Sequence, residues 1–394
     1  MMDAAAQPLY DLSPLFWLLL VGVLTALGPL AWVWWRNRGA SSGRRLQALT
    51  VLTLFLTFDL VLFGAFTRLT DSGLGCPDWP GCYGNASPIG AHADIAAAQA
   101  VMPTGPVTHG KAWVEMVHRY LASGVGFLLI VLTVASWVGY RRARAARAAH
   151  GHGLDDGLTA VSPWWPTVTL VWVCIQGAFG ALTVTMKLFP AIVTLHLLGG
   201  LALLFLLCAQ AVLRTHAVQQ RRPVPVSSGL RVLLWGVFAL LTVQVALGGW
   251  VSTNYAVLVC TEFPSCQGSY WPPMDFQQGF QVWRPLGLLQ DGSHISFAGL
   301  TAIHYAHRLF AYLVLLGMAV LAWRLVRTPG LRAQGRWLGW LALLQLATGL
   351  SNVVLGWPLV AAVLHTGGAA ALTVVLTWAI YDSQADVLPS RVSV

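Results

Sequence analysis

Four histidines in this 394-residue chain occupy matched places in its two halves, inside segments that are otherwise apolar. His118 and His307 lie in EMVHRYLA and HYAHRLFA, while His196 and His365 lie further along in VTLHLLGG and AVLHTGGA. Two imidazoles on facing helices of a four-helix bundle form the usual axial pair of a b-type haem. A single histidine would more simply hydrogen-bond to a neighbouring helix, but four at duplicated positions favour iron ligation.

An acidic residue in one half and a further histidine in the other precede the first histidine by three residues. Glu115 and His304 therefore share a helical face with the histidine that follows them. Because a carboxylate inside a bilayer is costly, this difference predicts a reactive haem in one half and a permanent haem in the other. The alternative is a structural ion pair of Glu115 with Arg119 or Arg68. Zinc is a weaker prediction than haem, since Glu115 and His304 are the only candidates for a third ligand.

Two pairs of cysteines share one spacing, in SGLGCPDWPGCYG at 72–84 and in LVCTEFPSCQG at 258–268. An oxidising outer compartment predicts the disulfides Cys76–Cys82 and Cys260–Cys266. Closing so short a loop stabilises a fold by only about 2 kcal/mol, so we expect the first bridge to have a further role. It either caps the haem pocket or serves as an exposed, reducible bridge that passes electrons. The other two cysteines are expected to pack as small apolar residues within spans: Cys174 and Cys208.

Three arginines lie near the expected outer boundary of the membrane. Arg119 and Arg308 directly follow histidines, and Arg68 ends an apolar segment. They could hold haem propionates through bidentate contacts or serve as interfacial anchors, and the sequence leaves both readings open. The remaining histidines have no partner at a meaningful spacing: His92, His109 and His294 in outer loops, and His150, His152 and His216 in inner loops.

Composition indicates that membrane-spanning helices position these residues. The chain is 57% hydrophobic and 9% charged, and its apolar runs reach the roughly 20 residues that cross a bilayer as a helix. No run alternates with the period of two that an outer-membrane strand requires. We predict an all-α polytopic membrane protein with nine spans, near residues 14–35, 47–67, 112–139, 165–187, 190–213, 231–253, 298–325, 337–356 and 358–381.

Basic residues determine the predicted orientation. The net charge is +9, and Lys and Arg concentrate in short loops on one side of the predicted spans. By the positive-inside rule these loops are cytoplasmic, which places the N-terminus and both cysteine loops outside and the C-terminus inside. The charge therefore reflects topology and does not indicate a nucleic-acid partner. The first span lacks a basic leader and a small-residue cleavage site, so we predict a retained anchor and not a signal peptide.

The second half of the chain repeats the first. GAFTRLTDSGLGCPDWPGCYG at 64–84 aligns with GGWVSTNYAVLVCTEFPSCQG at 248–268, and QGAFGALTVTMKLFPAIVTLHLLGG at 176–200 aligns with QLATGLSNVVLGWPLVAAVLHTGGA at 345–369. Both units run in one direction, which predicts two pseudo-symmetric four-helix bundles as a parallel repeat. The predicted units are an anchor helix and basic loop at 1–46, four-helix units at 47–222 and 223–383, and a cytoplasmic tail at 384–394.

The repeated histidines lie at one predicted depth. Each is about 6 to 9 residues from the outer end of its helix, or roughly 9 to 14 Å at 1.5 Å per residue. A shared iron requires such matched depth. Small residues after the second histidine of each half, including Gly199 and Gly368, are expected to leave room for a porphyrin face.

These motifs resemble the haem A synthase family, which oxidises haem O to haem A for cytochrome c oxidase assembly. The resemblance covers about residues 47–381 and rests on two E/HxxHR segments, two CxxxxxC loops and two later histidines. It implies that His118 and His196 bind the iron of the substrate haem O. It also implies that Glu115 is needed to oxidise the C8 methyl of haem O to a formyl group, by successive hydroxylations with water-derived oxygen.

The resemblance further implies that His307 and His365 hold a permanent haem b, and that Cys76 and Cys82 take part in activity while the second cysteine pair is structural. Haem A would be the product, and the expected location is a bacterial inner membrane. Membrane lipid, a haem O synthase and cytochrome c oxidase assembly factors are the expected partners, and a homo-oligomer is left open. A di-haem b-type electron-transfer protein is the alternative function. Members of the family usually have eight spans, so the span at 14–35 is unexplained.

Overall fold

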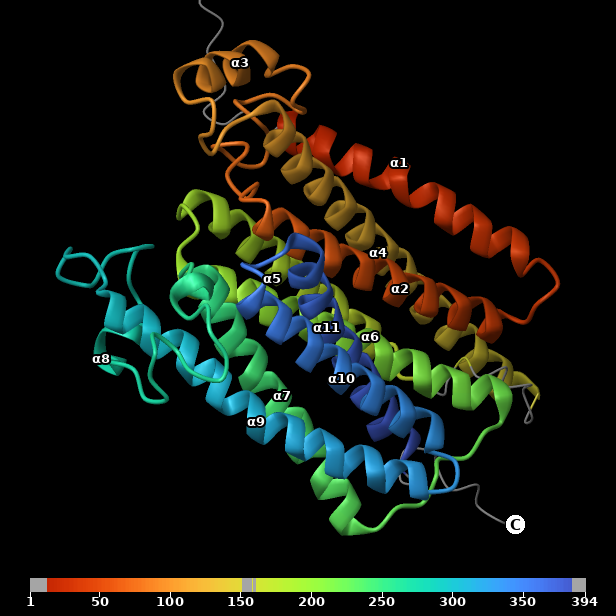
Figure 1. Cartoon of the computed structure of the whole chain (residues 1–394). Coiled ribbons are helices and arrows are strands. Elements are labelled where there is room, and N and C mark those ends of the chain that lie inside the picture. Colours follow the sequence, from red (N-terminus) through yellow and green to blue (C-terminus); the bar gives the residue numbers. More distant parts are fainter. Residues whose placement is uncertain (1–12, 151–157, 159–160, 385–394) are drawn as a thin grey trace, which may run out of the picture.

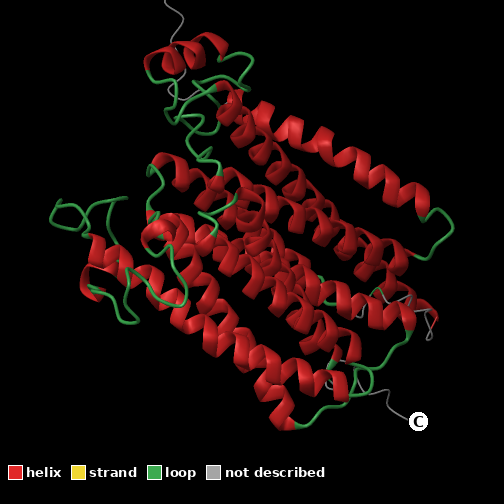
Figure 2. Cartoon of the chain, viewed as in Figure 1, coloured by secondary structure: helices red, strands yellow, loops and turns green. Residues whose placement is uncertain are grey.

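The fold is helical over the residues that the structure describes. The computed structural model describes residues 13–150, 158 and 161–384, which form helices joined by loops (Figure 2). Nine helices in this part of the chain are long and apolar enough to cross a membrane, which confirms the predicted number of spans. They are α1 (Ser13–Arg36), α2 (Ser42–Leu69), α4 (His109–His150), α5 (Trp164–Thr185), α6 (Pro190–Gln219), α7 (Ser228–Thr253), α9 (Phe297–Arg327), α10 (Arg332–Val354) and α11 (Leu359–Asp382).

Helix ends follow local sequence signals. Ser41, Ser227 and Ser296 cap the N-termini of α2, α7 and α9, and each side chain accepts a hydrogen bond from the backbone N–H three residues further on. The helix α4 extends beyond the predicted span at 112–139 and continues to His150 through RRARAARAAH, a stretch rich in the strong helix formers Ala and Arg. His152 and residues 385–394 of the predicted tail lie outside the described residues.

The spans other than α1 form two rings of four helices. In the first ring α2 packs on α4, α4 on α5, α5 on α6 and α6 on α2. The same cycle runs through α7, α9, α10 and α11 in the second ring, and α11 contacts both α2 and α6 across the interface between rings (Figure 1). This arrangement is compatible with the predicted repeat. The unit boundaries at 47–222 and 223–383 stay a prediction.

The loops that carry the cysteine pairs contain short helices that hydropathy does not reveal. These are α3 (His92–Val101), η1 (Val257–Val259) and α8 (Phe276–Gly279). In both cysteine loops the second cysteine pairs with a residue three positions later through an isolated backbone bridge, Cys82 with Asn85 and Cys266 with Ser269. The two loops therefore share a local backbone arrangement, although their sequences differ at most positions.

A buried polar cluster joins the two rings at the end opposite the cysteine loops. Asp382 of α11 accepts a hydrogen bond from Gln334 of α10 at 2.6 Å, and its other carboxylate oxygen lies 2.6 Å from Nε2 of His216 on α6. Arg221 approaches the same carboxylate at 3.5 Å. The expectation that His216 has no partner is therefore wrong, because Asp382 is distant in sequence and only the packing of α6 on α11 brings it close.

Candidate functional site

Each ring of helices brings two histidines together across its centre. His118 on α4 and His196 on α6 are close enough to interact electrostatically, and so are His307 on α9 and His365 on α11. In each case the two helices are diagonal members of the ring, since the other two helices lie between them. The predicted pairs therefore meet where core side chains or a flat apolar cofactor would fill a bundle.

A glycine on a neighbouring helix lies against each of these four imidazoles. These helices are α2 and α5 in the first ring and α7 and α10 in the second. A Cβ at Gly248 would press on the ring and one at Gly64 or Gly349 would be tight against it, whereas one at Gly180 would make an ordinary van der Waals contact. The distances from an added Cβ to Cε1 of the ring are 3.0 Å for Gly64 on His118, 3.4 Å for Gly180 on His196, 2.8 Å for Gly248 on His307 and 3.2 Å for Gly349 on His365.

The ring nitrogens of the histidines are poorly satisfied by the protein. The Nδ1 atoms of His118, His196 and His307 are buried and have no hydrogen-bond partner among the described residues. Nδ1 of His365 lies 2.9 Å from the hydroxyl of Thr348. Buried polar atoms are rarely left without a partner, and neutral imidazoles are common haem ligands. One imidazole from each of two diagonal helices fits the donor set of an axially ligated haem in both rings.

Glu115 lies one turn before His118 on α4 and is held by the first cysteine loop. Its carboxylate accepts a hydrogen bond from the backbone N–H of Cys76 at 2.8 Å and forms an ion pair with Arg119 at 2.5 Å. Arg119 also donates to three carbonyl groups of residues 78–81 in the same loop. The ion pair that the sequence left open is thus present, and it fixes the carboxylate between α4 and the loop.

His304 occupies the equivalent place in the second ring. Its Nδ1 lies 2.9 Å from the carbonyl oxygen of Ala256, and its Nε2 lies 3.3 Å from the guanidinium of Arg308. Arg308 also donates to the carbonyl of Ser265 in the second cysteine loop at 2.9 Å. Both rings therefore use an arginine bonded to a cysteine loop, but it holds a carboxylate in one ring and an imidazole in the other. Only the carboxylate offers a negatively charged proton acceptor.

Arg68 connects the two halves of the chain. It donates to the carbonyl of Ser252 at 2.5 Å, pairs with Asp71 at 3.3 Å and lies 4.2 Å from the ring centre of Tyr255. Arg68, Arg119 and Arg308 thus direct guanidinium donors at protein groups. Their predicted contacts with haem propionates stay a prediction.

Both predicted disulfides are formed, and the Cα atoms of each are 4.9 Å apart. All four of their cysteines are fully buried. The expectation of an exposed Cys76–Cys82 bridge is therefore wrong. Leu18 of α1, Ile95 of α3 and Met116 of α4 pack around this bridge, and neither the short helix α3 nor the position of α1 could be foreseen from the spacing of the cysteines.

Other residues that the sequence singled out lie elsewhere. The rings of His92 and His109 are 4.5 Å apart, so the expectation that they have no partner is wrong. Cys208 is buried as expected, whereas Cys174 is exposed on α5 and does not pack in the core. No three His, Cys, Asp or Glu side chains gather as a metal site in the part of the chain that the structure describes.

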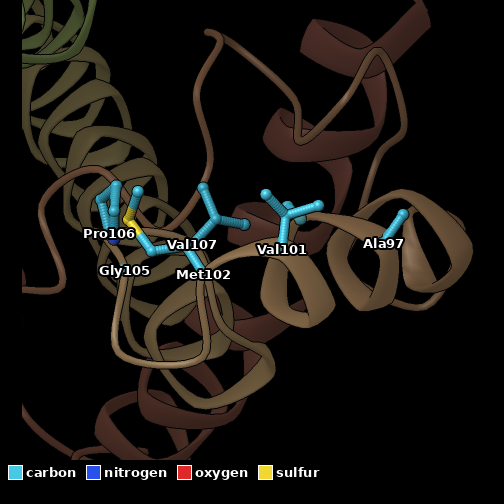
Figure 3. A pocket seen from close by; sticks show the side chains of 7 residues that line it. Ala97, Val101, Met102, Gly105, Pro106 and Val107 are labelled. Atoms are coloured by element: carbon cyan, nitrogen blue, oxygen red, sulfur yellow. The ribbon is translucent and has the colours of Figure 1, made fainter.

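A surface pocket of about 480 Å³ lies in the segment that joins α2 to α4. Its lining comes from α3 and the segment that follows, and Figure 3 shows Val101, Met102 and Val107 in it. The lining residues carry no titratable or metal-ligating nitrogen, and none belongs to either histidine pair. The pocket is therefore separate from the candidate site and lacks groups that could do its chemistry.

Two glutamines that the sequence did not single out hold the backbone beside the second histidine pair. Gln244 of α7 donates to the carbonyl of His307 at 3.2 Å, and Gln345 of α10 donates to the carbonyl of His365 at 2.9 Å. In the first ring Leu60 stands at the place that the repeat assigns to Gln244. The helices that carry the second pair therefore have polar support that the first pair lacks on α2.

Gly199 and Gly368 were expected to leave room for a porphyrin face, but each lies against a glutamine side chain. A Cβ added to Gly199 would lie 1.5 Å from Nε2 of Gln176, and one added to Gly368 would lie 2.2 Å from Nε2 of Gln345. These glycines thus make room for a glutamine side chain and not for a porphyrin face. The alignment of QGAFG at 176–180 with QLATG at 345–349 contained this signal, since both glutamines occupy one repeat position.

Comparison with known proteins gives consistent matches. The family of cytochrome oxidase assembly proteins designated COX15-CtaA matches residues 47–377. A protein named haem A synthase from Shewanella oneidensis is 36% identical over 336 residues, which cover 84% of this chain and 94% of the relative. Proteins of the same name from Halalkalibacterium halodurans and Caulobacter vibrioides are 26% and 28% identical, with 82% of this chain and 91% of each relative covered.

Proposed function

Because the chain belongs to the COX15-CtaA family of cytochrome oxidase assembly proteins, we propose that it converts haem O into haem A by oxidising the C8 methyl to a formyl group. The names of its relatives support this reaction. The observation that carries the proposal is the presence of an imidazole pair in both rings with a carboxylate beside only one of them. Such an asymmetry separates a reactive site from a permanent one.

In the first ring His118 and His196 would bind the iron of the substrate haem O, which would supply the redox chemistry of the reaction. Gly64 leaves space for the imidazole of His118, since a Cβ there would be tight against the ring at 3.0 Å. Each hydroxylation would add the oxygen of water to the methyl carbon and release two protons and two electrons. Glu115 would accept a proton, and the electrons would leave through the second ring to an external electron acceptor. The hydrogen bond from the N–H of Cys76 keeps its carboxylate in place for this role.

In the second ring His307 and His365 would hold a resident haem b, which would supply electron transfer when bound. The chain contributes a half-buried imidazole from each of two diagonal helices. Gln244 and Gln345 tie the histidine backbones to α7 and α10. Gln345 has a counterpart in the first ring, Gln176, but Gln244 has none, since Leu60 stands at its place. The added support from α7 favours the second ring as the permanent site, because a substrate must be exchanged while a cofactor stays.

The chain is a multi-pass membrane protein, and its proposed location is a bacterial inner membrane. The cysteine loops and both haem sites would face the periplasm, as the distribution of basic loops indicates. Proposed partners are a haem O synthase that delivers the substrate, assembly factors of cytochrome c oxidase that receive the product, and membrane lipid. Oligomerisation stays open.

Expression in a bacterium that makes haem O but no haem A tests the proposal. Haem extracted from its membranes should contain haem A, identified by mass, only when the chain is present. If the membranes gain haem b but haem O is not converted, the di-haem electron-transfer alternative is correct and the proposed reaction is not.

The glycine against His307 gives a sharper prediction for the resident haem. In Gly248→Ala the new Cβ would lie 2.8 Å from the ring, so the imidazole must shift from its position. We expect haem b retention to fall about fivefold or more, with altered low-spin haem signals in electron paramagnetic resonance. Gly236→Ala on the same helix is the control, since a Cβ there meets nothing within 4 Å. Equal haem content and spectra in both variants would show that Gly248 does not position the ligand.

A further inference from the structure

The first helix packs closely against the helix that carries Glu115 and His118. α1 lies beside α4 (Figure 1) and precedes the region that matches the family. A Cβ added to Gly22 of α1 would lie 2.4 Å from Cβ of Ser123 and 2.8 Å from its carbonyl carbon. The two backbones therefore touch, as helices do where small residues meet in membranes. This contact determines the register of α1 along α4.

The outer end of α1 reaches the first cysteine loop. Leu18 is 4% exposed and shares one buried cluster with Cys76 and Cys82, both of which are 0% exposed. Pro14, one turn earlier, lies against the loop itself, because a Cβ added to Gly81 would be 2.9 Å from the Cβ of Pro14. The disulfide is thus enclosed partly by a helix that comes from outside the four-helix ring.

The second disulfide is enclosed without such a helix. Cys260 and Cys266 pack with Tyr305 and Met274, which belong to their own half of the chain. Tyr305 stands where the repeat places Met116 in the first half. The larger side chain fills space beside the second bridge, and in the first half Leu18 of α1 packs in the corresponding cluster.

We propose that α1 is an intramolecular cover for the first cysteine loop, with Leu18 as the residue that separates the Cys76–Cys82 bridge from water and Gly22 as the contact that holds Leu18 in place. A reductant reaches a buried disulfide only when its cover opens, so the packing of α1 controls the rate of reduction. The same loop supplies the N–H that binds Glu115, so α1 also supports the candidate site. This inference concerns packing within the chain and does not rest on haem conversion.

Reduction of the two bridges in the purified full-length protein tests this proposal. Free thiols are blocked first, then tris(carboxyethyl)phosphine is added, and new thiols are alkylated and measured for each bridge by peptide mass spectrometry. We expect Leu18→Ala to speed reduction of Cys76–Cys82 about fivefold or more, with Cys260–Cys266 unchanged. Leu19→Ala is the matched control, because Leu19 is 52% exposed on the same helix.

A second pair of variants tests the register contact. Gly22→Leu must push α1 away from the backbone of α4, so we expect its Cys76–Cys82 bridge to be reduced faster. Gly28→Leu is the control, because a Cβ at Gly28 meets nothing within 4 Å, and its bridge should be reduced at the wild-type rate. If the Gly22→Leu protein does not accumulate in cells, the comparison of Leu18→Ala with Leu19→Ala tests the proposal by itself. Equal rates for Leu18→Ala and Leu19→Ala would overturn the proposal, and so would faster reduction of both bridges, which would indicate a general loss of stability.

Discussion

Replacing Glu115 with glutamine is expected to lower the rate of haem A formation about 100-fold or more, while haem b stays bound in the second ring. Glutamine has nearly the same shape, and its carbonyl can still accept the hydrogen bond from the N–H of Cys76. It cannot take up a proton in the way a carboxylate does, and loss of a general base typically costs two to four powers of ten. Single-turnover conversion of bound haem O, followed by extraction and chromatography, measures the effect.

The control for this variant is the matching change in the second ring. His304→Gln alters the residue that Arg308 contacts, at the place equivalent to Glu115, and should leave most haem A formation intact. Both variants should retain the Cys76–Cys82 bridge. Near-normal turnover in Glu115→Gln would show that Glu115 takes no part in the reaction. Loss of haem O binding together with the loop structure would instead support the purely structural ion pair with Arg119.

Removing either imidazole of the second pair is expected to eliminate the resident haem b. In His307→Ala or His365→Ala only one of the two diagonal ligands remains, and haem held by a single imidazole loses its low-spin character. We expect purified protein to lose about one haem per chain and the corresponding bands in its reduced visible spectrum. His294→Ala changes an exposed loop residue and should retain the haem and its bands. An unchanged pigment after loss of His307 or His365 would disprove ligation by this pair.

The same measurement separates the enzyme from an electron carrier. A carrier would hold haem b equally in both rings, so variants of His118 or His196 would lose haem b as variants of the second pair do. In the proposed enzyme, variants of the first pair lose haem O and haem A but retain haem b. The type of haem lost from each ring therefore distinguishes the two functions.

The nine spans and the two disulfides could be predicted because their signals are local. Apolar runs of about 20 residues identify spans regardless of how helices pack. The cysteines of each bridge lie close in the chain, so their loop brings them together before any tertiary contact is considered. The histidine pairs could also be predicted from the sequence, since the internal duplication provided two copies of each motif to compare.

The features that the sequence did not reveal depend on contacts between distant segments. The partner of His216 is Asp382, which only the packing of α6 on α11 brings near. Burial of the Cys76–Cys82 bridge depends on Leu18, from a helix that the repeat does not contain. The guanidinium of Arg119 donates to loop carbonyls because the first cysteine loop folds back over α4. The spacing of the cysteines in the sequence does not define this path of the loop.

The haem content of the purified wild-type chain tests the central claim most directly. Protein isolated from cells that make haem O should contain about two haems per chain, one of them haem b and the other haem O or haem A. Acidic extraction, chromatography and iron determination provide both identity and stoichiometry. Haem b as the sole pigment despite a supply of haem O, or a single haem per chain, would contradict one reactive and one resident site.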